Sequence, residues 1–223
     1  MIVALFDLDG TLYTGHIGRG ILQHHRLHRT NRFYLYAFLA ALTPIWMIGR
    51  LVSIPEASLR NIWVRNMSWV VRGWTPQEGA KAFSWIAKEY VAPLVRANII
   101  ERVRHHQASG HRAILVSGTF APLLAAIGRE LGIKDTVGTA LRLRKGRYVG
   151  SCEGTICQGP GKWLMVEAYL RGDSVAWDQS YAYADSYADL SLLEKVGHPV
   201  AVCPDRQLAA HAQGRGWEVI EDG

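Results

Sequence analysis

The hydrophobic pattern predicts that short strands and helices alternate along most of the chain. Residues 2–6 form an uninterrupted apolar run, which is typical of a parallel strand buried on both faces. Further strands are expected at residues 112–116, 133–139, 181–184, 199–202 and 217–221. Helices are expected at residues 122–131, 159–172, 189–196 and 207–213, and residues 141–151 alternate around Lys145-Gly146 as in a hairpin. Strands separated by helices predict an α/β fold with a doubly wound, Rossmann-like parallel sheet.

Residues 14–104 show a helical pattern instead. Ile17, Ile21 and Leu22 lie at helical spacing, and residues 33–49 carry no charge. Two helix starts follow: Pro55-Glu56, with Ser53 or Ile54 near the cap, and Thr75-Pro76-Gln77-Glu78, which should run with a bend at Pro93 towards Ser109-Gly110. The sequence therefore predicts an α/β core of residues 1–13 and 105–223, and an all-helical cap of three or four helices at residues 14–104.

Two carboxylates stand where the first strand should end. Asp7 and Asp9 are two residues apart, and Gly10 lets the backbone turn sharply after them. In an open α/β sheet, ligands bind at the carboxyl ends of the strands. A strand end with two solvated Asp residues is the simpler explanation, but the buried strand together with Thr11 favours a functional site.

The run Asp7-Leu8-Asp9-Gly10-Thr11 closely resembles the first motif of the haloacid dehalogenase superfamily, whose phosphatases carry D-x-D-G-T after the first strand. The resemblance implies that Asp7 is the nucleophile that attacks phosphorus and becomes an aspartyl phosphate. It implies that Asp9 protonates the leaving group and later activates water. An Asp at this second position indicates a phosphatase or phosphomutase.

Further site residues follow in the order that the resemblance implies. Ser117, with the amides of Gly118 and Thr119, would hold a phosphate oxygen, as would Thr11, and Lys162 would neutralise the developing charge. Asp185 and Asp189 form a D-x-x-x-D pattern after a strand. Magnesium would be held by Asp7, Asp185 and the Asp9 carbonyl, with Asp189 in support. Taken singly, these residues have ordinary explanations: a strand-to-helix turn, a solvated lysine and a helix N-cap.

The resemblance covers nearly the whole chain and is closest to the phosphoserine-phosphatase-like branch, with two departures. That branch carries a Glu in the first helix of its cap that holds the amino group of the substrate, whereas residues 13–17 contain no acid. Its final motif carries an Asn where this chain has Ala188. We therefore expect substrates with extra negative charge or an apolar tail rather than phosphoserine, with His16 and Arg19 as contacts.

Charge is distributed unevenly along the 223 residues. The formal net charge is +6, and residues 1–104 carry 13 Lys and Arg against 6 Asp and Glu, whereas the remainder carries 12 against 13. No acidic residue occurs between Asp9 and Glu56. A positive field of this kind favours anionic partners. Three cysteines without C-x-x-C spacing, and no secretory signal, favour a reduced, cytoplasmic chain without a disulfide framework or zinc site.

The predicted cap leaves two interpretations open. It holds five of the eight Trp residues, namely Trp46, Trp63, Trp69, Trp74 and Trp85, beside a basic cluster at residues 24–32. A well-packed lid with solvated Arg and His explains this composition, and so does peripheral contact with a membrane surface. The uncharged run is shorter than the ~20 residues needed to span a bilayer and contains Pro44, so a transmembrane helix is not expected. Nucleic-acid binding is not expected, because no recognised motif accompanies the charge.

The sequence thus predicts a magnesium-dependent phosphomonoester hydrolase that acts through an aspartyl phosphate on Asp7. Its substrate would be a small phosphorylated metabolite or a lipid-related phosphate. Two alternatives remain. One is a phosphotransferase or mutase that shares the first half-reaction, and the other is a non-catalytic relative that binds lipid or a partner. The complete set of Asp7, Asp9 and Asp185 argues against the last of these.

Overall fold

A seven-stranded sheet forms the centre of the protein. The computed structural model describes residues 1–51, 62 and 65–221. The sheet has the order β4-β3-β2-β1-β5-β6-β7, and every neighbouring pair is parallel except β3 and β4. The strands are β1 (Val3–Phe6), β2 (Arg112–Phe120), β3 (Asp135–Arg144), β4 (Arg147–Glu153), β5 (Tyr181–Ala184), β6 (His198–Val202) and β7 (Glu218–Ile220). The strand order reverses between β1 and β5, because β2, β3 and β4 follow on one side of β1 and β5, β6 and β7 on the other.

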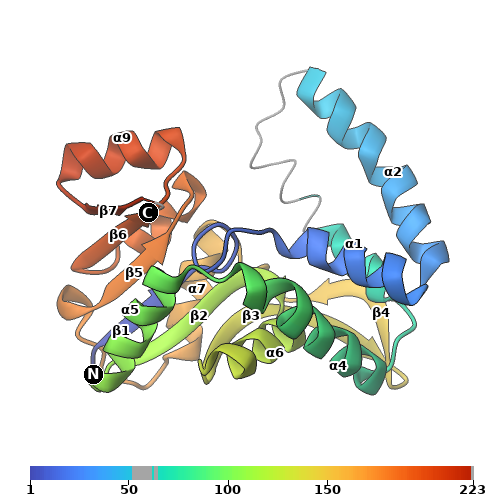
Figure 1. The fold of residues 1–223 in the computed structure, drawn as a ribbon, viewed down its shortest axis with the longest axis horizontal. Coiled ribbons are helices and arrows are strands. Elements are labelled where there is room, and N and C mark those ends of the chain that lie inside the picture. Colours follow the sequence, from blue (N-terminus) through green and yellow to red (C-terminus); the bar gives the residue numbers. More distant parts are fainter. Residues whose placement is uncertain (52–61, 63–64, 222–223) are drawn as a thin grey trace.

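Helices cover both faces of this sheet (Figure 1). Successive strand residues point to opposite faces, so Ala4 and Phe6 pack in one apolar cluster while Val3 and Leu5 pack in another. The first cluster includes residues of α5 (Ala97–Ala108) and α6 (Ala121–Leu131). The second includes residues of α7 (Pro160–Tyr169), α8 (Leu190–Leu193) and α9 (Arg206–Arg215). The α/β fold with a doubly wound, mostly parallel sheet is therefore confirmed.

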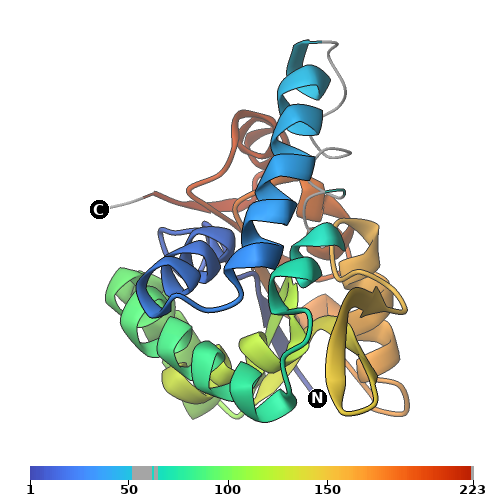
Figure 2. The ribbon, with the colours of Figure 1, turned by 90° about the vertical axis from the view of Figure 1, so that its right-hand side faces the viewer.

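The chain between β1 and α5, here called the insertion (residues 14–96), forms helices in its described part. They are α1 (Ile17–His28), α2 (Arg32–Leu51), η1 (Ser68–Val71), α4 (Pro76–Trp85), the π-helical η2 (Ile86–Val91) and η3 (Ala92–Leu94). In both views α2 projects away from the sheet (Figures 1 and 2). The start predicted at Pro55-Glu56 lies outside the described residues, as do the side chains of Trp46 and Trp63. Among the described helices, none combines the length and apolar character needed to cross a membrane.

The predicted start of α4 is confirmed, but its predicted course is wrong. Thr75 and Glu78 form a capping box, because the Thr75 hydroxyl accepts the Glu78 amide at 3.2 Å and the Glu78 carboxylate accepts the Thr75 amide at 2.7 Å. The expected single bent helix is broken instead at Val95 and Arg96, which are extended. The Arg96 amide donates to the Leu12 carbonyl at 3.0 Å, so the end of the insertion pairs with the residues just before its beginning. The predicted core–cap boundary between residues 104 and 105 falls inside α5.

Three further boundaries differ from the sequence expectation. Strand β2 continues beyond Val116 to Phe120, with a register shift between Ser117 and Phe120 against β3. Strand β3 runs unbroken through residues 135–144. It therefore joins the strand predicted at residues 133–139 and the first arm of the hairpin predicted at residues 141–151 in one element. The helix predicted at residues 189–196 is shorter than expected. The short η5 (Tyr187–Asp189) leads into α8, which ends at Leu193 with Glu194 as its C-cap. The hairpin at Lys145-Gly146 itself is confirmed.

Candidate active site

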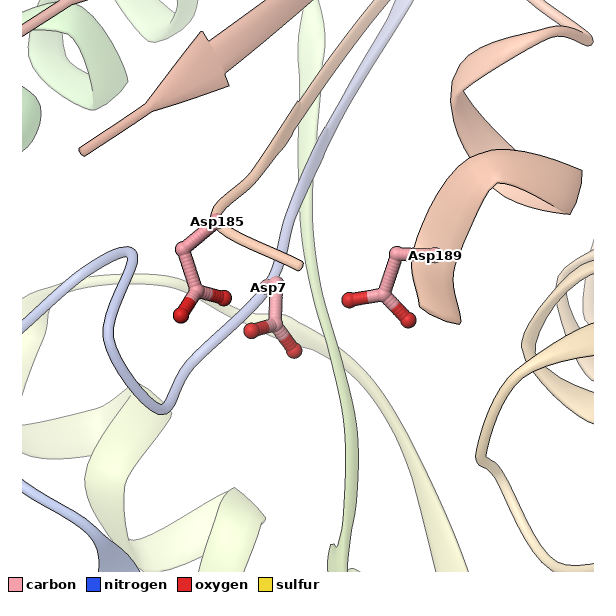
Figure 3. Close-up of side chains that lie close together, drawn as sticks. All are labelled: Asp7, Asp185 and Asp189. Atoms are coloured by element: carbon pink, nitrogen blue, oxygen red, sulfur yellow. The ribbon is translucent and has the colours of Figure 1, made fainter. Parts of the chain in front are cut away.

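Three carboxylates converge at the carboxyl ends of the central strands (Figure 3). Asp7 is the first residue after β1, Asp185 is the first after β5, and Asp189 ends η5. One carboxylate oxygen from each lies within 4.8 Å of the others. The strands β1 and β5 flank the point where the strand order reverses, which is where α/β sheets open a crevice for ligands. The fold therefore brings together residues that are more than 170 positions apart.

Lys162 bridges two of these carboxylates from the first turn of α7. Its ammonium donates to Asp7 Oδ1 at 2.5 Å and to Asp189 Oδ2 at 2.7 Å. All three side chains are at least nine-tenths buried. The Gly159-Pro160-Gly161 run before Lys162 starts this helix with Pro at its first position, so the lysine enters the site from a rigid element. A lysine in this position holds the carboxylates together and presents positive charge to an anion.

The site carries more negative than positive charge. Burial raises the pKa of Asp7 to about 6, and the neighbouring Asp185 carboxylate adds to this although Lys162 opposes it. Burial likewise raises the pKa of Asp185 to about 6, with Asp189 as the second cause. Burial alone would lower the pKa of Lys162, but the Asp189 and Asp7 carboxylates together raise it above its ordinary value. Lys162 is therefore charged at neutral pH but only partly offsets three carboxylates.

Asp9 lies beside this cluster and is held by two donors. The Tyr13 hydroxyl donates to Asp9 Oδ1 at 2.6 Å, and the backbone amide of Ile17, the first residue of α1, donates to the same oxygen at 2.8 Å. Tyr13 is fully buried, and its pKa is raised far above the ordinary value by burial and by the Asp9 carboxylate. The phenol therefore remains a hydrogen-bond donor to Asp9.

The turn after Asp9 fits closely around Asp185. Gly10 has φ +81°, and a Cβ at this position would overlap the Asp185 carboxylate, so glycine is required both by conformation and by space. The Thr11 hydroxyl lies 3.2 Å from Asp185 Oδ1 and 3.4 Å from Asp7 Oδ2. Thr11 is fully buried, does not line the cavity described next and contacts the carboxylates directly, so its predicted contact with phosphate stays a prediction.

A cavity of about 450 Å³ opens onto the carboxylates. Nine of the residues predicted from the sequence line it: Asp7, Asp9, His16, Ser117, Gly118, Thr119, Lys162, Asp185 and Asp189. Arg19 does not line it and instead lies on an outer face of α1 with Gln23 and Arg26. Around Ser117, the Thr119 amide donates to the Ser117 hydroxyl at 3.2 Å, within the irregular end of β2 rather than in a separate loop.

Sequence reasoning missed several residues that line the cavity: Met67, Phe120, Gln158, Ser186 and Asp205. Asp205 shapes the site, because its carboxylate caps α9 through the amides of Gln207 and Leu208 and also accepts the Tyr187 amide at 2.8 Å. Its own amide donates to the Asp185 carbonyl. An Asp directly before a helical segment is a recognisable N-cap pattern, so this residue had a signal in the sequence.

The donor set fits a hard divalent cation. The side chains of Asp7, Asp185 and Asp189 offer only carboxylate oxygens, the ligands that Mg²⁺ prefers, and they lie close enough to share one ion. The pKa values of Asp7 and Asp185 are raised mainly by burial and further by the neighbouring carboxylates, and a bound cation would stabilise the charged form of both groups. The three carboxylate side chains therefore fit a divalent cation, and the Asp9 carbonyl remains a predicted ligand.

The comparisons with known proteins agree with this geometry. Residues 4–194 match the family described as haloacid dehalogenase-like hydrolase. The chain is 31% identical over 220 residues to "Phosphoserine phosphatase SerB1" of Mycobacterium tuberculosis, covering 97% of this chain and 69% of that one. It is 33% identical over 136 residues to "Histidinol-phosphatase" of Neisseria meningitidis serogroup C, covering 59% of this chain and 61% of that one.

A solved structure is similar over nearly its whole length. The crystal structure of a protein of unknown function from Bordetella pertussis Tohama I has a TM-score of 0.81 and 28% identity, covering 98% of this chain and 97% of that one. The family match spans most of the chain, including Asp7, Lys162 and Asp189. The family predicted from the first motif is thus confirmed, and the chain is an enzyme of the haloacid dehalogenase-like hydrolase family.

Proposed function

We propose that the protein is a magnesium-dependent phosphomonoester hydrolase that acts through an aspartyl phosphate on Asp7. The observation that carries this proposal is the buried bridge from Lys162 to Asp7 and Asp189, directly beside Asp185. A lysine held against a carboxylate nucleophile lets an anionic phosphoryl group approach that carboxylate. Ser117, Gly118 and Thr119, on the neighbouring strand β2, line the same cavity and supply hydroxyl and amide groups for phosphate oxygens.

The reaction would proceed in two steps. An oxygen of Asp7 attacks phosphorus while the bond from phosphorus to the leaving oxygen breaks, and Asp9 gives its proton to that oxygen. Water then attacks the phosphorus of the aspartyl phosphate. Asp9 takes a proton from this water, Asp7 leaves as a carboxylate, and inorganic phosphate is released. Lys162 holds the orientation of Asp7 and offsets the charge that develops on the phosphoryl oxygens.

Magnesium would be held by Asp7 and Asp185, with Asp189 and the Asp9 carbonyl completing the protein ligands. When bound, it would neutralise charge on the phosphoryl oxygens and on the carboxylate cluster. The structural support is the all-oxygen donor set and the raised pKa values of Asp7 and Asp185.

The substrate would be a small phosphorylated molecule chosen by the insertion, which we propose acts as a cap. His16, Ile17, Gly18 and Met67 of this segment line the cavity, so they lie where the leaving alcohol would emerge. None of them is acidic, which argues against an ammonium group bound at this wall as the basis of selection. Phosphoserine and histidinol phosphate, the substrates implied by the names of the two relatives, both carry an amino group and are the first compounds to compare with uncharged and anionic phosphomonoesters.

The test is phosphate release from a generic aryl phosphate by the purified protein. We expect activity with Mg²⁺, none after chelation, and recovery when Mg²⁺ is restored. Asp7→Asn should abolish turnover, whereas Asp178→Asn, a change at an exposed carboxylate, should not. An active Asp7→Asn enzyme would refute the mechanism. The phosphotransferase alternative predicts that an added alcohol acceptor diverts most of the phosphoryl group from water.

We also propose a peripheral contact with an anionic membrane. The carrying observation is an arginine–apolar surface at the junction of α1 and α2, formed by Arg26, Arg29, Arg32, Phe33 and Tyr36, all of which are exposed. Phe33 is 77% and Tyr36 59% exposed, which is unusual for large apolar side chains. Basic residues next to exposed aromatic ones are what interfacial helices present to lipid headgroups.

A further inference from the structure

Tyr13 is a buried phenol at the site that belongs to none of the motifs described above. Its side chain is fully buried, and its hydroxyl donates to Asp9 Oδ1 at 2.6 Å. The Ile17 amide donates to the same oxygen at 2.8 Å. Two donors thus converge on one oxygen of the residue that we assign as the acid and base of the reaction.

This pairing restricts where the proton on Asp9 resides. A carboxylate oxygen has two lone pairs, and the Tyr13 hydroxyl and the Ile17 amide use both of those on Oδ1. A proton carried by Asp9 therefore belongs on Oδ2. We propose that Tyr13 is a positioning residue that fixes the Asp9 carboxyl group so that Oδ2 carries the transferred proton. This inference rests on the proposed phosphatase function.

Contacts other than the one to the Asp9 side chain hold the Tyr13 hydroxyl in place. The ring lies against Gly15, where a Cβ would approach the Tyr13 ring to 2.6 Å, and meets Tyr90 edge-on with ring centroids 6.4 Å apart. The Tyr13 backbone bridges to Asp9 on one side and to Val95 on the other. Because ring and backbone are both fixed, the hydroxyl orients Asp9 rather than following it.

In the first step, the proton on Asp9 Oδ2 passes to the leaving oxygen as its bond to phosphorus breaks. In the second step, Oδ2 takes a proton from the attacking water, which restores the acid. The Tyr13 proton stays on the phenol throughout. Without the phenol, the carboxyl group can turn about its own bond, and the proton is less often aimed at the leaving oxygen.

The experiment replaces only the hydroxyl, with Tyr13→Phe, and measures kcat/KM for two substrates. An alkyl phosphate has a poor leaving group that needs the proton, whereas nitrophenyl phosphate has a good one that does not. General acid catalysis contributes about 10²–10⁴-fold. We therefore expect kcat/KM to fall about tenfold or more for the alkyl phosphate and less than about twofold for nitrophenyl phosphate. The ratio kcat/KM is used because it reports steps up to departure of the leaving group and not the later attack of water.

Two further variants separate positioning from packing. Tyr90→Phe removes a hydroxyl that donates to the His16 carbonyl at 3.3 Å, on a ring that meets the Tyr13 ring edge-on. It should leave the ratio between the two substrates unchanged. Tyr13→Leu removes hydroxyl and ring together. It should give the same selective loss as Tyr13→Phe, with a lower Tm in addition. If the ring alone mattered, only Tyr13→Leu would change the ratio.

A double-mutant cycle tests whether Tyr13 acts through Asp9. On an Asp9→Asn background there is no carboxyl proton to position, so adding Tyr13→Phe should cost nothing further for the alkyl phosphate. Equal losses on both substrates, or additive losses with Asp9→Asn, would overturn the assignment of Tyr13. These outcomes differ from failure of the proposed function itself, in which the unmodified protein would hydrolyse neither substrate with Mg²⁺.

Discussion

Replacing Asp7, the proposed nucleophile, should stabilise the metal-free protein. The pKa of Asp7 is raised from 3.8 to about 6 in the folded protein, mainly because the carboxylate is buried, with Asp185 nearby. A folded pKa above the unfolded one means that the folded protein binds more protons between pH 4 and pH 6. Stability from this group therefore falls as the pH rises through that range and is lowest above pH 6. The difference of about 2 in pKa corresponds to about 3 kcal/mol.

Asp7→Asn keeps the shape of the side chain and removes its charge. At pH 7.5 and without metal we expect an increase in unfolding free energy of at most about 3 kcal/mol, which for a chain of this size is a rise of about 6–12 °C in Tm. At pH 4.5 the folded wild-type carboxylate is mostly protonated, so the difference should shrink by about two-thirds. Differential scanning calorimetry at both pH values measures this directly, with Asp178→Asn as the exposed control.

Two results would refute this reasoning. One is an Asp7→Asn protein that is less stable than wild type at pH 7.5. In that case the ion pair with Lys162 would stabilise the folded protein by more than burial of the Asp7 carboxylate destabilises it. The other is an equal difference at both pH values, which would show that the effect does not come from ionisation of Asp7. Added Mg²⁺ supplies an internal check, because it should raise the Tm of wild type more than that of Asp7→Asn.

Two further predictions concern the turn after Asp9 and the surface of the insertion. Gly10→Ala should lower stability by about 1 kcal/mol or more and abolish phosphatase activity, because φ is +81° and the new Cβ would displace the Asp185 carboxylate; a fully active variant would contradict this account of the turn. Replacing Arg26, Arg29 and Arg32 with Gln should reduce sedimentation with anionic vesicles at low salt, but not turnover of an aryl phosphate. Gln at three exposed basic residues of the β3–β4 hairpin (Arg142, Arg144 and Lys145) is the control, and equal loss in both sets would indicate unspecific attraction.

Much of the site was predictable because residues that directly follow parallel strands lie together at one edge of the sheet. Asp7 and Asp185 each follow an apolar run directly, and parallel strands that end at one edge of a sheet bring such residues together. Lys162 and Ser117 were predictable only through the resemblance, since a lysine near glycines or a serine after a strand is common. The roles of these two residues came from the resemblance to the family, because the local sequence pattern does not indicate them.

Most of the remaining features depend on contacts that local pattern does not encode. The break at Val95 and Arg96 is fixed by backbone pairing with a segment some 80 residues earlier. The Thr14 amide donates to the Leu94 carbonyl, and the Arg96 amide donates to the Leu12 carbonyl. Helical periodicity does not predict such a pairing. Arg19 was expected at the site, together with His16, because the predicted cap is rich in basic residues and should choose the substrate. Arg19 is two residues from both Ile17 and Ile21, which lie on the buried face of α1, so the helix turns it outward with Gln23 and Arg26. The apolar spacing of this helix already contained that information. Gln158 enters the cavity from a loop without a recognisable pattern.

The proposed nucleophile and the proposed acid are anchored by different parts of the protein. Asp7 continues β1, its amide donates to the Tyr183 carbonyl of β5, and Lys162 holds its carboxylate, so the sheet and α7 fix it. Asp9 is oriented by Tyr13 and by the Ile17 amide, which belong to the segment that leads into α1. A displacement of α1 that left the sheet undisturbed would therefore turn the acid while leaving the nucleophile in place. Because His16, which precedes α1, and Ile17 and Gly18 in its first turn also line the cavity, a leaving group that presses on them acts on the same helix that orients its proton donor. In the proposed mechanism, selection of the substrate and delivery of the proton would thus be coupled through the start of one helix.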